Sequence, residues 1–147
     1  MFSFTKENTE FDIEVSNWEE AIIQTGTLLE ENGYASENYK YSIIKDVLKY
    51  GSYIMLSPGI VIPHTRPENG SKEIGFVFLT VKNDVYFNDN KKDPIKILIG
   101  FTAKDNDNHI EMLQMIIKII TEGLVDKLDY FLKLNEESKL KYLNKFI

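Results

Sequence analysis

Two histidines and a single arginine are the residues in this 147-residue sequence best suited to group-transfer chemistry. His64 and Arg66 lie together in the segment GIVIPHTRPENG, at positions 59–70, and His109 lies further along the chain. An imidazole carries protons near neutral pH and can act as a nucleophile, while a guanidinium matches the oxygens of a phosphate. This combination predicts a site that handles a phosphoryl group or a proton.

The residues around His64 predict how it is held. An apolar run, Ile60–Ile62, leads directly into Pro63, and Pro67 follows Arg66. Each proline restricts its own backbone and biases the preceding residue towards an extended conformation. We therefore expect a buried strand that stops abruptly and displays His64 on a stiff, exposed turn.

His109 lies at the start of a helical pattern, whose core-facing stripe is predicted to be Ile110, Leu113, Ile116, Ile117 and Ile120. One interpretation of His109 is a polar, solvent-facing residue of the first turn. The other is a ligand for an anion, because a helix N-terminus offers free N–H groups and the positive end of the helix dipole. A neutral imidazole there can donate a hydrogen bond to the same anion.

Composition excludes several classes of function. The formal charge of −6 and the pI near 5.0 argue against nucleic-acid binding. The absence of cysteine excludes disulfides and thiolate chemistry, and two histidines without a metal-binding spacing give no support to a metal site. The acidic segment 105–108 resembles the start of a calcium loop but lacks its glycine and its final glutamate. No nucleotide-binding motif occurs. Together these observations predict no metal and no cofactor.

The length predicts one domain, residues 1–147, able to bury its own core. The sequence shows no secretory signal and no apolar run long enough to cross a bilayer, so we expect a cytoplasmic protein without direct membrane insertion. Strand patterns occur at 10–15, 53–56, 60–62, 74–81 and 95–102. Helical patterns begin near residues 16, 36 and 109 and again beyond residue 123, and polar loops and turns connect the elements. The predicted fold class is an α/β (α+β) sandwich, a mixed central β-sheet of about five strands with helices on both faces.

Local signals predict where several elements begin and end. In the first strand, Phe11, Ile13 and Val15 are expected on one face. Ser16 and Glu19 have the spacing of a capping box at the start of the first helix. Gly33, Gly51 and Gly123 are expected to end the first three helices, and two further helices are predicted at 124–134 and 135–146.

The motifs GIVIPHTRPENG and HIEML, with NWEEAI near the N-terminus and DPIKILIGFTAKDNDN before His109, resemble a known family. It is the enzyme IIA component of the bacterial phosphoenolpyruvate-dependent sugar phosphotransferase system (PTS), in the fructose–mannitol superfamily. The resemblance is strongest to the ascorbate-type branch and covers most of the chain. It implies a phosphotransferase, with a phosphohistidine intermediate, that serves sugar uptake.

The resemblance also implies roles for individual residues. His64 matches the histidine that takes a phosphoryl group from the phosphocarrier HPr and passes it to a cysteine of the cognate enzyme IIB, which serves the membrane component IIC. His109 matches the second histidine, which stabilises the phosphorylated state. Some members carry an arginine before the strand, where this chain has only Lys49 nearby, so that role is not assigned. Arg66 is the expected cation, as a possible phosphate contact. Ascorbate is the sugar that the branch suggests, with fructose, mannitol and galactitol open.

Two other functions fit the same residues. Domains of this superfamily also act as regulators that bind other proteins in a phosphorylation-dependent way. A small metal-dependent hydrolase is the third possibility, in which the two histidines with Asp105 or Asp107 would hold zinc.

Overall fold

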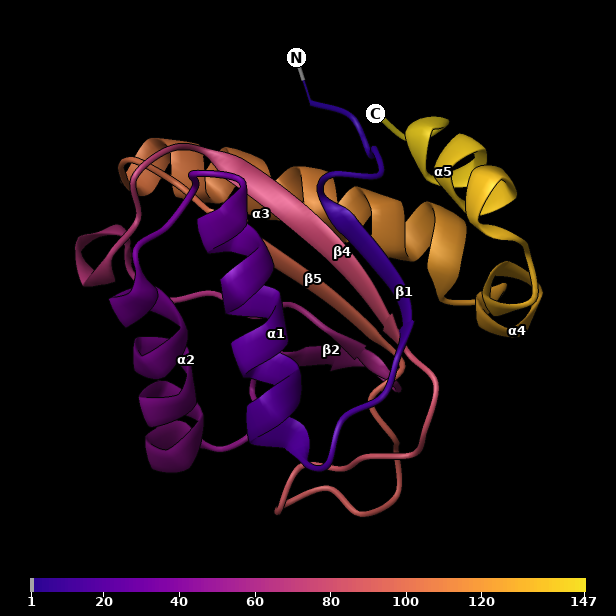
Figure 1. The fold of residues 1–147 in the computed structure, drawn as a ribbon, viewed down its shortest axis with the longest axis horizontal. Coiled ribbons are helices and arrows are strands. Elements are labelled where there is room, and N and C mark those ends of the chain that lie inside the picture. The colour runs from indigo at the N-terminus through magenta and orange to yellow at the C-terminus, as the bar shows by residue number, and fades with distance from the viewer. Residues whose placement is uncertain (1) are drawn as a thin grey trace.

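The computed structural model describes residues 2–147, and two fully buried strands form the centre of its sheet (Figure 1). These are β4 (Gly75–Val81) and β5 (Ile97–Thr102), which pair antiparallel. Both are rich in β-branched and aromatic residues, which pack well on a pleated surface. Because every residue in them is buried, both faces of the sheet must be covered.

Three shorter strands complete the sheet. They are β1 (Thr9–Ile13), β2 (Met55–Ser57) and β3 (Ile60–Val61), and the strand order is β1-β4-β5-β3-β2. β1 lies parallel to β4 and β3 parallel to β5, while β2 runs antiparallel to β3. The prediction of a mixed sheet of about five strands is confirmed.

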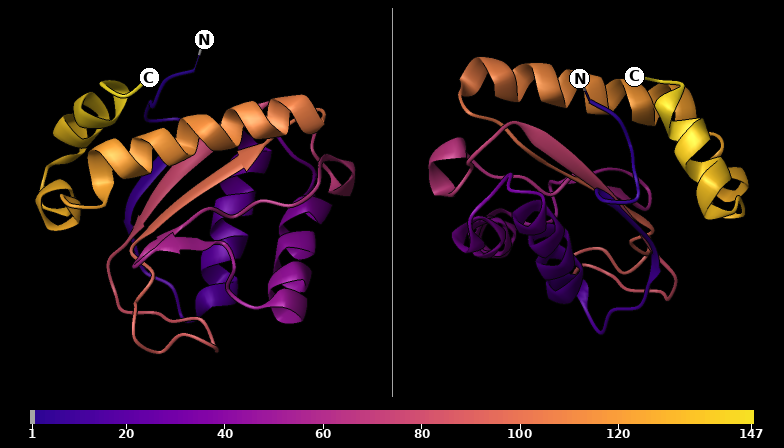
Figure 2. Two further views of the ribbon diagram at one scale, coloured as in Figure 1. Left: turned by 180° about the vertical axis from the view of Figure 1, so that it is seen from behind. Right: turned by 45° about the horizontal axis from the view of Figure 1, so that its top comes forward.

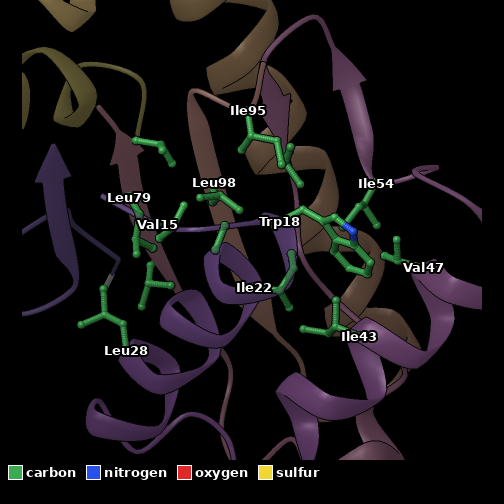
Figure 3. Packing of buried hydrophobic residues seen from close by; sticks show 14 of the residues in the cluster. Val15, Trp18, Ile22, Leu28, Ile43, Val47, Ile54, Leu79, Ile95 and Leu98 are labelled. Carbon is green, nitrogen blue, oxygen red and sulfur yellow. The ribbon is translucent and has the colours of Figure 1, made fainter. Parts of the chain in front are cut away.

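Helices cover both faces of the sheet, as predicted (Figure 2). One face packs on α1 (Trp18–Glu31) and α2 (Glu37–Tyr50), and Figure 3 shows Trp18 and Ile43 meeting across that core. The other face packs on α3 (Asn106–Ile119), the π-helical turn η2 (Ile120–Leu124), α4 (Leu128–Leu132) and α5 (Glu136–Asn144). No helix within residues 2–147 has both the length and the apolarity to cross a membrane.

The predicted alternation of the first strand is wrong. Phe11 packs in the core under α3, whereas Ile13 and Val15 pack in the core under α1 and α2. The reason is an irregularity in the pairing with β4 between Glu10 and Ile13, where Asp12 adopts a φ of 58°. An extra residue in a strand shifts the following side chains to the opposite face.

The caps of two helices differ from expectation. Asn17, not Ser16, is the N-cap of α1, and its side chain accepts from the N–H of Glu20 at 2.9 Å. Ser16 instead donates its N–H to the Glu20 carboxylate at 3.3 Å, so the reciprocal pair is displaced by one residue. Gly123 does not end the third helix, because η2 continues through it and the ring of Phe146 packs closely over its Cα.

The predicted core stripe of the third helix is confirmed for Ile116 and Ile120, with Leu113 partly buried against the same core, and is wrong for the other two residues. Met112, Ile116 and Ile119 are buried, whereas Ile110 is 54% exposed and Ile117 38% exposed. Apolar residues occur on several sides of α3, so their spacing alone does not fix which side faces the sheet. The fourth helix is shorter than predicted, since only Leu128–Leu132 is α-helical after the η2 turn.

The parallel pair of β3 and β5 positions the two histidines. Parallel strands bring their carboxyl ends to the same edge of a sheet, where open α/β folds bind their ligands. His64 follows β3 after Pro63, and His109 follows β5 in the first turns of α3. The topology therefore places both histidines at one edge.

Candidate functional site

The His64 ring is held by one hydrogen bond and one stacking contact. Its Nδ1 lies 2.6 Å from the carbonyl oxygen of Ile62. Since a carbonyl only accepts, Nδ1 must carry the proton, and in the neutral ring Nε2 then keeps its lone pair. The ring also stacks on Phe101, with 4.8 Å between centroids and 26° between planes. This hydrogen bond therefore fixes the tautomer of the neutral His64 ring.

The expectation that His64 stands on an exposed turn needs correction. His64 is half-buried, because it lies against Phe101 and faces Tyr53, whose ring centroid is 6.4 Å away. Burial lowers the pKa of His64, because the charged imidazolium is poorly solvated there, and the nearby His109 lowers it further. The Ile62 carbonyl and Asp46 act in the opposite direction but do not outweigh burial.

His109 lies beside His64, as the topology predicts. The two ring centroids are 5.4 Å apart, and that of His109 is 5.1 Å from Phe101, so both imidazoles contact the same buried phenyl ring. This separation is short enough for both rings to reach one phosphoryl group. Burial also lowers the pKa of His109, which favours the neutral ring that can donate a hydrogen bond from one nitrogen.

The third helix begins earlier than expected, at Asn106, so His109 is its fourth residue rather than its first. The Asp105 side chain caps the helix by accepting from the N–H of Asn108 at 2.8 Å, and the His109 N–H donates to the Asp105 carbonyl at 3.0 Å. These two N–H groups are therefore already satisfied. The side chain of His109, and not its backbone, is what α3 offers to a bound anion.

A pocket of about 630 Å³ opens over the two histidines. Arg66, the third predicted site residue, lies on its wall, is exposed, and forms no ion pair within residues 2–147. Its guanidinium is thus free to meet an anion in the pocket. The remaining residues of the wall are Asp46, Tyr50, Tyr53, Thr65, Glu68 and Asn69.

Sequence reasoning missed the contribution of α2. This helix presents Asp46 and Tyr50 to the pocket, and the ammonium of Lys49 lies 5.1 Å from the centroid of the Tyr50 ring. Asp46 accepts a hydrogen bond from the hydroxyl of Thr65 at 2.8 Å. Nothing in the sequence indicates this contact, because Thr65 lies between two other polar residues, His64 and Arg66, and Asp46 is one of several polar residues of α2.

Because folding lowers the pKa values of both histidines, the unfolding free energy should depend on pH. In the unfolded chain both pKa values return towards 6.5, so between the folded and unfolded values the unfolded state binds more protons. Unfolding free energy should therefore be at its full value above about pH 6.5 and fall as the pH drops below it. Urea titrations from about pH 7.5 to 5 measure this.

The matched control for that measurement is the double variant His64→Gln/His109→Gln, which removes both imidazoles and leaves every carboxylate in place. Its unfolding free energy should change less over the same pH interval. Equal slopes for the two proteins would show that the histidine pKa values are not depressed by folding.

Residues 2–143 match the model of the family described as phosphoenolpyruvate-dependent sugar phosphotransferase system, EIIA 2. The chain belongs to this family. A relative from Escherichia coli (strain K12), the mannitol-specific cryptic phosphotransferase enzyme IIA component, is 36% identical over 124 residues, covering 84% of this chain and 82% of the relative. The ascorbate-specific PTS system EIIA component of Salmonella typhi is 34% identical, covering 78% of this chain and 76% of the relative.

Solved structures agree with this assignment to the enzyme IIA family. The solution structure of the Escherichia coli mannitol-specific cryptic enzyme IIA has 31% identity and a TM-score of 0.81, covering 97% of this chain and 95% of its own. The fold also matches an Escherichia coli mannitol enzyme IIA solved in complex with phosphorylated enzyme IIB, at a TM-score of 0.80 and 22% identity, over 97% of this chain and 98% of that one. At that identity the likeness concerns the fold alone.

Proposed function

We propose that this enzyme IIA is a phosphohistidine carrier, which accepts a phosphoryl group on Nε2 of His64 from HPr and passes it to a cysteine of the cognate enzyme IIB. The observation that carries the proposal is the bond from Nδ1 of His64 to the Ile62 carbonyl, which leaves Nε2 as the nucleophile beside His109. The proposal treats residues 1–147 as one domain that works in the cytoplasm, where HPr is found, and that serves the membrane component IIC through IIB.

Each transfer conserves atoms and charge. In the first step the lone pair of His64 Nε2 attacks phosphorus, and the P–N bond to the donor histidine of HPr breaks. In the second step a thiolate of IIB attacks phosphorus, and the P–N bond to His64 breaks, returning the neutral ring. The proton on Nδ1 stays in place throughout, held by Ile62.

Catalysis then depends on alignment and on stabilising the equatorial oxygens of the phosphoryl group. The ring N–H of His109 and the guanidinium of Arg66 are the donors that the pocket offers for this purpose. Two carboxylates, Asp46 and Glu68, line the same pocket. Their negative charges repel a bound phosphoryl group, which raises the free energy of the phosphorylated state and favours onward transfer.

The proposal considers two sugar systems, mannitol and ascorbate. The relatives include a mannitol-specific and an ascorbate-specific protein at similar identity, and the carrier itself does not contact the sugar. Assays with mannitol-type and ascorbate-type IIB proteins would distinguish these two systems by the rate at which each accepts the phosphoryl group.

The direct test is to supply labelled phosphoenolpyruvate with enzyme I and HPr. We expect one phosphoryl group per chain, labile in acid as a P–N bond requires, located on the peptide that contains His64 and lost when IIB is added. An acid-stable label, or a label on another residue, would contradict the proposal. A labelled protein that binds IIB or another partner without releasing the phosphoryl group would exclude the carrier role and favour a regulatory one.

A further inference from the structure

Thr65, the residue after His64, is buried and hydrogen-bonded through both its side chain and its backbone. It is only 4% exposed, and its hydroxyl both donates to the Asp46 carboxylate at 2.8 Å and accepts from the Asn69 amide at 2.9 Å. Asp46 belongs to α2, and Asn69 belongs to the short 3₁₀ turn η1 (Pro67–Asn69) that follows Arg66. One hydroxyl therefore links α2, the histidine loop and the turn beyond it.

The backbone of Thr65 is held by the same helix. The hydroxyl of Tyr39, from the first turn of α2, accepts from the Thr65 N–H at 3.3 Å and donates to the Phe101 carbonyl at 2.7 Å. Tyr39 is 1% exposed, so this bridge is shielded from competing water. Phe101 is the residue on which the His64 ring stacks. Tyr39 thus connects the neighbour of His64 to the residue that supports its ring.

We propose that α2 sets the position of the His64 ring by holding Thr65 through Asp46 and Tyr39, so that Thr65 is a positioning residue for phosphoryl transfer. Pro63, on the other side of His64, restricts the backbone before it. With Thr65 fixed after it, the Cα of His64 has little freedom. The ring itself is constrained by the Ile62 carbonyl and the Phe101 face. This role rests on the proposed function of His64.

The physical reason for such a clamp is the demand of in-line transfer. A displacement of about 1 Å of a reacting atom can cost about 10²-fold in rate, even when the substituted residue does not touch the reacting group. Thr65 bonds to residues of α2 and η1, and not to His64, His109 or Arg66. Loosening it should therefore lower the rate of the chemical step and leave the affinity for the partner unchanged.

The decisive variants are Thr65→Val, which keeps the shape but removes the hydroxyl, and Thr65→Ser, which keeps the hydroxyl. We expect Thr65→Val to lower the kcat of transfer to IIB by about 10-fold or more, with KM unchanged, and Thr65→Ser to restore most of it. Tyr39→Phe should act in the same direction, whereas Tyr41→Phe, on an exposed face of α2, should have no effect.

Two substitutions of Asp46 distinguish a positioning role from an effect of its negative charge. Asp46→Asn keeps a carbonyl acceptor for the Thr65 hydroxyl but removes the negative charge, whereas Asp46→Ala removes both. The loss of charge is common to both variants, so if α2 acts by positioning, Asp46→Asn keeps a clearly larger fraction of the wild-type kcat than Asp46→Ala. If both variants change the rate equally, Asp46 acts through its charge and the positioning role is wrong.

A spectroscopic measurement makes the test independent of transfer. The ¹⁵N signals of the His64 ring report whether Nδ1 carries the proton and is bonded to Ile62. We expect a single Nδ1–H tautomer in the wild type and Thr65→Ser, and a tautomer mixture in Thr65→Val. Unchanged ring signals together with wild-type kcat in Thr65→Val would overturn the proposal. A wild-type protein that takes no phosphoryl group would overturn the proposed function instead, and the ring signals alone would then decide whether Thr65 positions His64.

Discussion

His64→Gln is expected to take up no phosphoryl group from HPr, because the side-chain amide of glutamine has no nucleophilic lone pair on nitrogen. The substituted side chain is of similar length and stays polar, so the half-buried position is not left empty. The lost bond to the Ile62 carbonyl should cost about 1 kcal/mol of unfolding free energy, a modest change. Intact-protein mass spectrometry after incubation with the donor system measures the phosphorylated fraction directly.

The matched control is His109→Gln, which alters the other imidazole of the same pocket and leaves the proposed nucleophile intact. This control should still become phosphorylated, at a reduced rate. A His64→Gln protein that is folded by its thermal transition yet takes up the same acid-labile group as the wild type would falsify the assignment of His64. Equal and complete loss in both variants would indicate that the two rings act as one unit.

The two histidines show which features of the site could be predicted from the sequence. The strand before His64 and the helix at His109 were predicted from apolar runs and cap residues, and the family resemblance implied that the histidines share a site. Residue patterns alone do not state that β3 pairs with β5, since partner choice in a sheet is decided by tertiary packing. The parallel pairing is what brings the two rings to 5.4 Å.

Other features had no signal in the sequence. The positive φ of Asp12 interrupts an alternation that otherwise reads as regular, and it moves Ile13 to the opposite core. The burial of Met112 and Ile119 in place of Ile110 and Ile117 was not predictable, because apolar residues occur on several sides of α3 and contact with the sheet decides which of them are buried. Asp46 reads as an ordinary polar residue of an amphipathic helix until α2 is placed beside the loop of Thr65.

His109→Ala is expected to slow phosphoryl transfer by about 10²-fold, the effect of removing one preorganised donor from a site that stabilises developing charge. The same donor interacts with the phosphorylated ground state, so the equilibrium with HPr should also shift towards unphosphorylated enzyme IIA. A hydrogen bond to a charged group is worth about 1.5–3 kcal/mol, which corresponds to about 10-fold or more in that equilibrium. Quench-flow kinetics gives the rate, and the phosphorylated fraction at fixed HPr gives the equilibrium.

Comparing the two quantities decides what His109 does. A fall in both rate and phosphorylated fraction means that the ring N–H binds the phosphoryl oxygens before and during transfer, as its 5.4 Å separation from His64 allows. A fall in rate alone means that the contact forms only in the transition state. Gln114→Ala, at an exposed position of the same helix, controls for a general weakening of α3. If His109→Ala has the wild-type rate and equilibrium, Arg66 must be the donor to the phosphoryl group. Its guanidinium lies on the pocket wall and forms no ion pair within residues 2–147.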